Sequence, residues 1–380
     1  MRTFAFQSVP PVTTSIWEQQ GSAIVGDAAE DYLGSSVTLS ADAKTLVVGA
    51  PGPYGNTDRE GYVKVYRMTD DGGSRTQLGQ TIYGNATGDL FGWSVDVTAQ
   101  GNVILLGSPG SSWEVNDKPG YVQVFSLDSD DETAGTTGTW KQVGQDIAGA
   151  AIGDEFGQSV SISDDGKTIA VGARTNDGKN GEYSGHVRIY RLADDGASWE
   201  RIGGDIDGDA EYDMLGDSVS LSANGTIVAI GAPNAGIDGI LQAGQVKVYR
   251  IDSGGSSWEQ LDESIYGDKA DDWFGNSVDI SPDGNSLAVG TSVDVGPGYV
   301  KVFSLEDGGG VDDDLGAILF GDLDLAMGPG QISNLTLELA GLDIAEALLL
   351  ARLARLRGAE TGVSVYVQLF QGTPLLMQLF

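Results

Sequence analysis

The sequence predicts an all-β fold, a β-propeller of four-stranded antiparallel blades, followed by a small C-terminal α/β appendage. The first observation is an internal repeat, because marker glycines separated by 58, 65, 59 and 59 residues stand at Gly34, Gly92, Gly157, Gly216 and Gly275. The second is that each copy holds four short strand-like segments, and the third is a Trp that opens the last segment of most copies. Short strands repeated at this period are typical of propeller blades rather than of a sandwich or a solenoid.

The first two segments of each copy form a predicted hairpin. The opening segment reads S-V-x-(L/I/V), and its alternation predicts a strand at 36–39, 94–97, 159–162, 218–221 and 277–280. Dipeptides that tolerate positive φ then mark a tight turn at Asp165-Gly166, Asn224-Gly225 and Asp283-Gly284. The next segment must therefore pair antiparallel. Its continuous apolar run, as in 46–50 and 227–232, fits a strand covered on both faces.

The third and fourth segments complete the blade. The third reads G-x-V-x-V-(Y/F) and begins at Gly61, Gly120, Gly185, Gly244 and Gly298. The fourth begins at Trp140, Trp199 and Trp258, whereas residues 74–77 take the same place without a Trp. The chain also starts with a fourth-strand segment, Trp17-Glu18-Gln19, and the fifth copy ends after its third strand at Leu305. We therefore expect the N-terminal strand to complete the last of five blades and to close the ring without open strand edges.

The composition changes after the fifth copy, which divides the chain into a tail over residues 1–16, a propeller over 17–308 and a Leu-rich appendage over 309–380. Gly308-Gly309-Gly310 predicts a linker, 342–357 a helix and 363–369 a strand. The appendage is interpreted as a small packed unit. A partner-docking or oligomerising element and a degenerate extra blade are the alternatives.

Two sequence motifs resemble those of the FG-GAP repeat family, the propeller repeats of integrin α-subunits and of many secreted or surface proteins. Phe91-Gly92, Phe156-Gly157 and Phe274-Gly275 match the first motif, and Gly49-Ala50-Pro51 and Gly231-Ala232-Pro233 match the second. The resemblance covers residues 17–306. It implies a propeller used in cell adhesion and partner binding rather than in chemistry, and an extracellular or cell-surface location.

The family's calcium loop, D-x-D-x-D-G-x-x-D, does not carry over to this chain. The turns between the first two strands, such as 41–43 and 282–284, are too short to wrap an ion that needs six to eight oxygens.

Composition excludes several function classes. With 55 acidic against 21 basic residues, the formal charge of −34 predicts no binding to nucleic acid or to anionic membranes. The absence of cysteine excludes disulfides and thiolate catalysis. No segment predicts membrane insertion, and residues 1–11 lack the apolar stretch of a signal peptide.

Acidic residues recur in two patterns. An aspartate precedes each marker glycine by three residues, at Asp31, Asp89, Asp154, Asp213 and Asp272. It is interpreted as a turn-fixing acceptor of backbone N–H groups, with a cation-binding ring around the central channel as the alternative. A second cluster breaks the repeat and alternates along one segment, which predicts either a Ca²⁺ site of oxygen ligands or a solvated acidic loop. Its members are Asp205, Asp207, Asp209, Glu211 and Asp213.

Specificity is expected in the variable loops between second and third strands, which share one face with the loops that enter each blade. Aromatic and basic residues on this face are the predicted contacts of a protein or glycan ligand. They are Tyr54, Arg59, Trp93, Trp113, Lys118, Arg174, Tyr183 and Trp273.

Two function classes follow. The first is a non-enzymatic module that binds a protein or glycan through this loop face, with no catalytic residues. The alternative is a propeller-type carbohydrate-active hydrolase with paired carboxylates, which carboxylates paired across the channel with raised pKa would favour. The single histidine, His186, stands at the first position of a third strand and is expected to be exposed, so neither a Ser-His-Asp triad nor a histidine metal site is predicted.

Overall fold

The computed structural model describes residues 19, 21–53, 60–68, 74–110, 119–128, 138–237, 239–292, 297–305, 335–337, 364–368 and 374–378. The chain divides into two compact units, Met1–Gly321 and Asp322–Phe380. The boundary expected near residue 309 lies outside the described residues, as do the tail and the predicted helix over 342–357. Every described element is a strand, and no helix among the described residues is long and apolar enough to cross a membrane.

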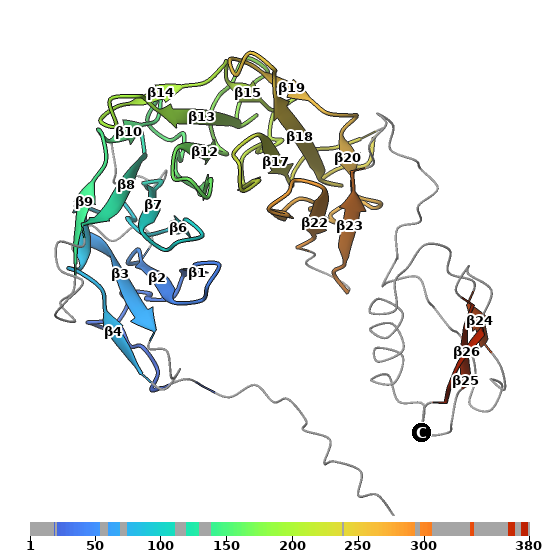
Figure 1. Ribbon diagram of the computed structural model, residues 1–380. Helices are drawn as coiled ribbons and strands as arrows, with labels where there is room; N and C mark the ends of the chain where they lie inside the picture. Colours follow the sequence, from blue (N-terminus) through green and yellow to red (C-terminus); the bar gives the residue numbers. More distant parts are fainter. Residues whose placement is uncertain are drawn as a thin grey trace, which may run out of the picture. The chain divides into compact units, whose positions relative to one another are not determined.

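Five antiparallel sheets of the first unit follow one another along a curve, with the first strand of each on its inner side (Figure 1). The first sheet comprises β1 (Ser36–Leu39), β2 (Thr45–Ala50), β3 (Glu60–Met68), β4 (Arg75–Gln77) and β5 (Ile82–Thr87). The second comprises β6 (Ser94–Val97), β7 (Val103–Ser108), β8 (Tyr121–Asp128), β9 (Thr139–Gln142) and β10 (Ile147–Ala148). The third comprises β11 (Ser159–Ile162), β12 (Thr168–Ala173), β13 (His186–Leu192), β14 (Trp199–Arg201) and β15 (Ile206–Asp207). The fourth comprises β16 (Ser218–Leu221), β17 (Ile227–Ala232), β18 (Gln245–Ile251), β19 (Trp258–Gln260) and β20 (Ile265–Tyr266).

The outermost strand of these four sheets differs from the prediction, because it is divided into two pieces that both pair with the third strand. In the third sheet, β14 pairs with the end of β13 and β15 with its beginning. The pieces of the fourth sheet are separated by residues 261–264, which contain no glycine. In the other three sheets a glycine with positive φ stands between the pieces, at Gly79, Gly144 and Gly203. Its left-handed backbone breaks the regular strand, so the predicted four-stranded blade is confirmed with an interrupted outer edge.

The fifth sheet holds three described strands, β21 (Ser277–Ile280), β22 (Ser286–Gly290) and β23 (Val300–Ser304). Trp17 and Glu18, which are expected to supply its fourth strand, lie outside the described residues. The closure of a five-bladed ring therefore stays a prediction.

A repeated glycine contact joins each sheet to the next and explains the two sequence motifs. The second-strand Gly231 lies so close to the marker Gly275 that a Cβ on Gly231 would stand 2.0 Å from the carbonyl oxygen of Gly275. The same carbonyl accepts the hydroxyl of Ser218 at 2.7 Å. Equivalent hydroxyl bonds join Ser36 to Gly92, Ser94 to Gly157 and Ser159 to Gly216. The marker glycines adopt positive φ, at +97° in Gly157, so only glycine fits both sides of the junction.

The cores lie between neighbouring sheets. Each marker phenylalanine is fully buried, as in Phe91, Phe156 and Phe274. On the outer edge, the indole Nε1 of Trp140 donates to the carbonyl of Leu78 at 2.8 Å, and that of Trp199 donates to Val143 at 2.9 Å. These Trp side chains therefore tie the outer strand of one sheet to that of the preceding sheet.

We expect Trp140→Phe to lower the free energy of unfolding by about 1–3 kcal/mol more than Trp258→Phe does, because it leaves the carbonyl of Leu78 without its donor. Trp258 is the matched control, since its Nε1 is buried without a hydrogen-bond partner and both substitutions remove the same ring atoms. Urea unfolding of the two variants measures the difference. Equal losses would show that packing alone, and not the indole bond, joins the outer edges.

The second unit contains three described strands, β24 (Leu335–Leu337), β25 (Ser364–Gln368) and β26 (Pro374–Gln378). β24 pairs parallel with β25, and β25 pairs antiparallel with β26. The run predicted as a strand over 363–369 corresponds to β25.

Candidate functional site

The aspartate before each marker glycine fixes the loop that enters the blade. All five are buried, with 1–8% of the residue exposed. Asp213, for example, accepts the amides of Asp209 and Ala210 at 2.9 and 2.8 Å. In three copies a third-strand tyrosine also donates its hydroxyl to this carboxylate, over 2.5 to 2.7 Å, in the pairs Tyr62–Asp31, Tyr121–Asp89 and Tyr299–Asp272. These contacts confirm the turn-fixing interpretation rather than a ring of cation-binding carboxylates.

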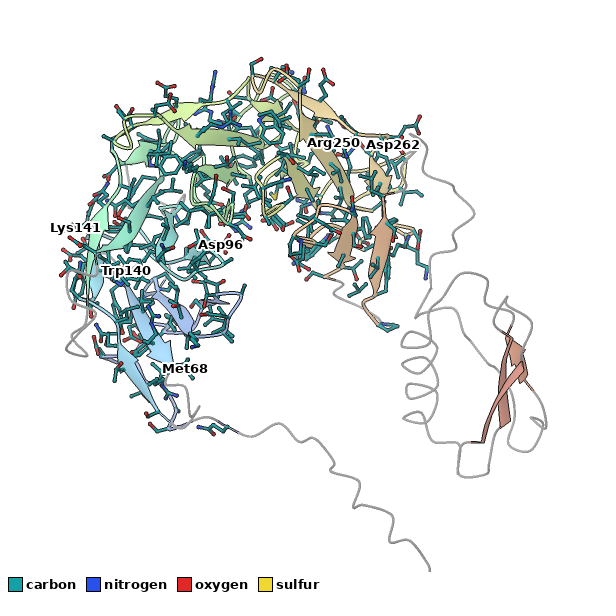
Figure 2. All side chains as sticks on the ribbon, in the orientation of Figure 1. Met68, Asp96, Trp140, Lys141, Arg250 and Asp262 are labelled. Carbon is teal, nitrogen blue, oxygen red and sulfur yellow. The ribbon has the colours of Figure 1, made fainter. Side chains whose placement is uncertain are left out.

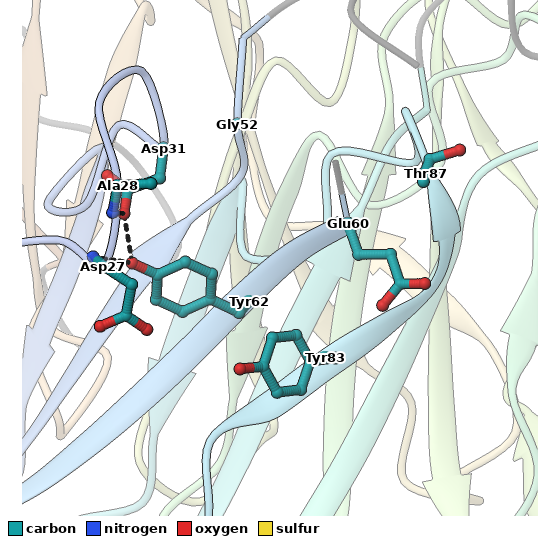
Figure 3. A pocket seen from close by; sticks show the side chains of 8 residues that line it. All are labelled: Asp27, Ala28, Asp31, Gly52, Glu60, Tyr62, Tyr83 and Thr87. Carbon is teal, nitrogen blue, oxygen red and sulfur yellow. Dashed lines mark hydrogen bonds between the residues drawn. The ribbon is translucent and has the colours of Figure 1, made fainter. Parts of the chain in front are cut away.

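A pocket of about 320 Å³ opens beside the first of these pairs (Figure 3). It is lined by Asp27, Ala28, Asp31, Gly52, Glu60, Tyr62, Tyr83 and Thr87. The rings of Tyr62 and Tyr83 are cross-strand neighbours 6.0 Å apart and form one wall, with the carboxylates of Asp27 and Asp31 near the Tyr62 hydroxyl. Such a mixture of aromatic rings and hydrogen-bonding groups suits a hydroxylated ring.

The Asp31 carboxyl of this pocket does not hold a proton at neutral pH. Burial opposes the ionisation of Asp31, but the hydrogen bonds from Tyr62 and from backbone amides outweigh it and lower the pKa of the carboxyl. The Asp27 carboxylate is ion-paired with Lys64 at 2.5 Å. This pocket can therefore bind a polar ligand better than it can protonate one.

A second group of polar residues lies on the innermost strands, at the third position of S-V-x-(L/I/V). Here the side chain of one sheet accepts a backbone amide from the first strand of the next sheet. Ser161 accepts the amide of Leu221 at 3.0 Å, and Ser220 accepts that of Ile280 at 3.1 Å. Asp96 performs the same task for the amide of Ile162, at 2.8 Å. Figure 2 shows Asp96 on the inner side of the curve of sheets and Lys141 on the outer side.

Asp96 is the member of this row whose ionisation is most changed. Burial raises its pKa to about 6, against the hydrogen bonds from Ile162, Val97 and Ser161, and the charge of Asp279 adds to the rise. Asp279 stands at the equivalent position of β21, is exposed, and accepts the hydroxyl of Ser220 at 3.4 Å. A carboxyl whose pKa is raised, in part by the charge of a second carboxylate, is one mark of an acid and base pair.

The structure does not gather the five carboxylates of the predicted calcium cluster. Asp205 accepts from Arg188 and Arg201, and Asp209 from Lys247 and Gln245. Asp213 is occupied by backbone amides, and Glu211 lies against Gly181. Asp205 and Asp207 instead approach His186. The five carboxylates do not converge on one point where a Ca²⁺ ion could contact them all, and a calcium site stays a prediction.

His186 is only 1% exposed, which corrects the expectation of an exposed side chain. The side chain at this position near the start of the third strand is covered in other copies as well, since the equivalent Tyr62 and Tyr121 are 5% and 6% exposed. Burial lowers the pKa of His186 to about 4, and the charge of Arg188 acts in the same direction. The imidazole is therefore neutral at pH 7.

The predicted loop-face contacts have varied surroundings. Arg174 is held by Glu155 at 2.7 Å and by Asp217 at 2.9 Å. Tyr183 is 38% exposed and packs edge-on against Tyr212, while Trp93 and Trp273 are half-buried. Tyr54, Arg59, Trp113 and Lys118 lie outside the described residues. A ligand role for this face stays a prediction. The sequence repeat could not show that the Arg174 side chain is already ion-paired within the protein.

The resemblance to FG-GAP repeats expected from the sequence motifs is confirmed for one segment of the chain by a direct match. Residues 148–190 match the FG-GAP repeat model. This segment runs from the end of β10 to β13 and contains Phe156-Gly157. No curated protein sequence matches the chain significantly.

Solved structures similar to this chain include a putative 6-phosphogluconolactonase, a periplasmic gluconolactonase and a putative TolB. A putative 6-phosphogluconolactonase from Bacteroides uniformis has a TM-score of 0.50 and 15% identity, covering 73% of this chain and 69% of its own. The periplasmic gluconolactonase PpgL of Pseudomonas aeruginosa has a TM-score of 0.47 and 17% identity, covering 72% and 68%. Putative TolB from Agrobacterium tumefaciens has a TM-score of 0.37 and 15% identity, covering 71% and 76%.

At these identities the likeness is one of fold. It shows a propeller-like architecture that carries enzymes, and the lactonase finding contradicts the expectation that the chain is not an enzyme. That expectation rests on the FG-GAP resemblance, because the repeats of that family serve in binding. The motif residues that carry the resemblance form the glycine junctions between sheets. Those junctions specify the architecture and do not bear on chemistry.

Proposed function

We propose that this protein is a propeller-type carbohydrate-active hydrolase in which Asp96 and Asp279 form the catalytic pair. The observation that carries the proposal is the presence of a carboxyl at position 96, where Ser161 and Ser220 make the same bond between sheets without a charge. A serine would suffice for the structural task, so the carboxyl with its raised pKa is explained by a second role.

The roles follow from the surroundings of the two groups. Asp96, with a pKa of about 6, holds a proton in mildly acidic solution and donates it to the leaving oxygen of the scissile C–O bond. Asp279, exposed to water, takes a proton from the attacking water, whose oxygen forms the new bond to carbon. One proton leaves Asp96 and one is gained by Asp279, so the total number of protons on the pair is unchanged. Proton exchange with solvent then returns Asp96 to its protonated form and Asp279 to its ionised form.

The substrate class proposed is a neutral sugar derivative, either a glycoside or a sugar lactone. The lactone is included because the similar Bacteroides uniformis structure is described as a 6-phosphogluconolactonase. The net charge of −34 opposes the approach of a phosphorylated sugar, so the uncharged form is favoured here.

Hydrolysis of p-nitrophenyl glycosides and of gluconolactone across pH 4–8 tests the proposal. We expect kcat to fall as the pH rises above about 6, because Asp96 then loses the proton that it donates. Asp96→Ser keeps the acceptor for the amide of Ile162 and should lower kcat by roughly 10²–10⁴-fold, while Asp271→Asn, an exposed charge elsewhere, should leave it unchanged. Hydrolysis that survives in Asp96→Ser and in Asp279→Ser would refute the assignment.

Three further features belong to the same proposal. The N-terminal segment 17–19 closes the ring by pairing with the outer edge of β23. Among the described strands, β23 is paired only with β22, on its other edge. Tyr183 and Trp273 provide aromatic contacts to the sugar on the loop face. The FG-GAP repeat supports a location outside the cytoplasm.

A further inference from the structure

His186 interrupts the tyrosine–aspartate pattern in the third sheet. The equivalent residue is Tyr62, Tyr121 and Tyr299 in three copies and Gln245 in the fourth. In the register of β13 with β15, His186 lies directly opposite Asp207. Asp205 immediately precedes β15 and accepts a hydrogen bond from Arg188, two residues after His186 on β13. Because side chains alternate along a strand, His186, Asp205 and Asp207 share one face of the sheet.

The His186 side chain has an unpartnered nitrogen on this face. Its Nε2 is fully enclosed and makes no hydrogen bond, in a residue that is 1% exposed. A buried polar atom without a partner destabilises the folded state. One ligating atom of His186 and one carboxylate oxygen each of Asp205 and Asp207 lie within 4.8 Å of one another, a spacing at which a single ion can contact all three.

We propose that His186, Asp205 and Asp207 bind one divalent transition-metal ion of the Zn²⁺ type. An imidazole nitrogen with two carboxylate oxygens suits Zn²⁺ or Co²⁺, whereas Ca²⁺ prefers a larger set of oxygens alone. A metal would give the enclosed nitrogen the partner that the tyrosine hydroxyls of the sister sheets find in their aspartates.

The neighbouring cations limit the affinity and fix the geometry. Arg188 donates to both oxygens of Asp205, at 2.7 and 3.0 Å, and Arg201 donates to Oδ1 at 2.8 Å. Oδ2 of Asp205 accepts only one of these bonds and is the oxygen left to the metal. Asp207 is paired at 3.2 Å with Lys179, whose side chain is 73% exposed and can move away. The guanidinium contacts orient Asp205, as hydrogen bonds to metal-binding carboxylates do.

Calorimetric titration of the full chain with Zn²⁺ tests the site, with Co²⁺ absorption as a report of nitrogen ligation. We expect one equivalent to bind and to raise the thermal midpoint. His186→Gln places at this position the residue that the fourth sheet already carries, and should weaken binding at least about tenfold. Asp271→Asn changes the net charge by the same amount as the loss of any one carboxylate and should bind normally.

A second pair of variants separates metal loss from misfolding. His186→Tyr restores the side chain found in three copies, and Asp207→Asn removes one proposed ligand at a half-buried site. Both should fold, with unchanged circular dichroism, and bind Zn²⁺ weakly. One-equivalent binding that persists in folded His186→Gln or His186→Tyr would overturn the proposal. So would a wild-type chain that binds several equivalents weakly, because that is the behaviour of an acidic surface.

Discussion

Gly231→Ala is expected to cost about 3 kcal/mol of stability or more. The new Cβ would stand 2.0 Å from the carbonyl oxygen of Gly275 and 2.4 Å from the hydroxyl of Ser218. Neither backbone can retreat, because Ser218 binds that same carbonyl and β17 is paired on both sides. Overpacking of this kind costs about 1–3 kcal/mol, and more where backbone must move. Urea unfolding followed by Trp fluorescence measures it.

Two glycines are matched controls for this substitution. A Cβ on Gly204 would meet nothing within 4 Å, so Gly204→Ala should change stability by no more than about 0.5 kcal/mol. Gly290 holds the same strand position in the fifth sheet, but its Cβ would meet only atoms of Ser277. Gly290→Ala should therefore cost less than Gly231→Ala. If Gly231→Ala proved as mild as Gly204→Ala, the close junction between sheets would be wrong.

Asp96→Ser is expected to stabilise the protein at pH 7 by up to about 3 kcal/mol while it removes activity. The pKa of Asp96 rises from 3.8 to about 6 on folding, so its ionised form is disfavoured in the native state, and each pKa unit corresponds to about 1.36 kcal/mol. The serine makes the same inter-sheet bond as Ser161 and Ser220 without that penalty. Stability gained at the expense of activity is the usual mark of a functional residue.

The pH dependence of this gain has a definite sign. Between pH 3.8 and about 6 the folded state holds more protons at Asp96 than the unfolded state does, so the stability of the wild type falls as the pH rises through this window. The advantage of Asp96→Ser should thus be absent below pH 3.8, grow up to about pH 6 and then stay constant.

Asp195→Ser is a control whose effect on stability should vary with pH in the opposite direction. Backbone amides of Ala197 and Ser198 bind this carboxylate and lower its pKa. Its substitution should therefore destabilise the protein at pH 7 and lose that effect in acid. Asp96→Ser and Asp195→Ser varying with pH in the same direction would contradict the assignment of Asp96 as the raised carboxyl.

The repeated strands could be predicted from the sequence because their signals are local. Alternation in S-V-x-(L/I/V) and the turn dipeptides determine hairpins such as β16–β17, and the observed register of Ser218 with Gly231 follows from the turn length. The division of the outer strand could not be predicted, since Gly203 resembles any turn glycine until its φ of +73° is seen.

The candidate site was less accessible to sequence reasoning. Asp96 lies in a motif where Ser161, Ser220 and Asp279 are all allowed, and the sequence does not reveal that β6 and β21 lie near enough for Asp279 to change its pKa. The expectation of an exposed His186 is wrong because strand alternation predicts the face of the sheet on which a side chain lies but not what covers that face. A comparison of the copies does contain the signal, because histidine replaces a tyrosine that three of the other four copies retain.

The serine-to-glycine junction has one more consequence. Because Ser36, Ser94, Ser159 and Ser218 each bind the marker glycine of the following copy, the four junctions between the described sheets are made from the same few atoms. Duplication or deletion of one whole copy would therefore leave each remaining junction chemically unchanged. The number of copies can thus vary in descent without redesign of the interfaces, while each copy is free to acquire its own chemistry at residues such as Asp96 and His186.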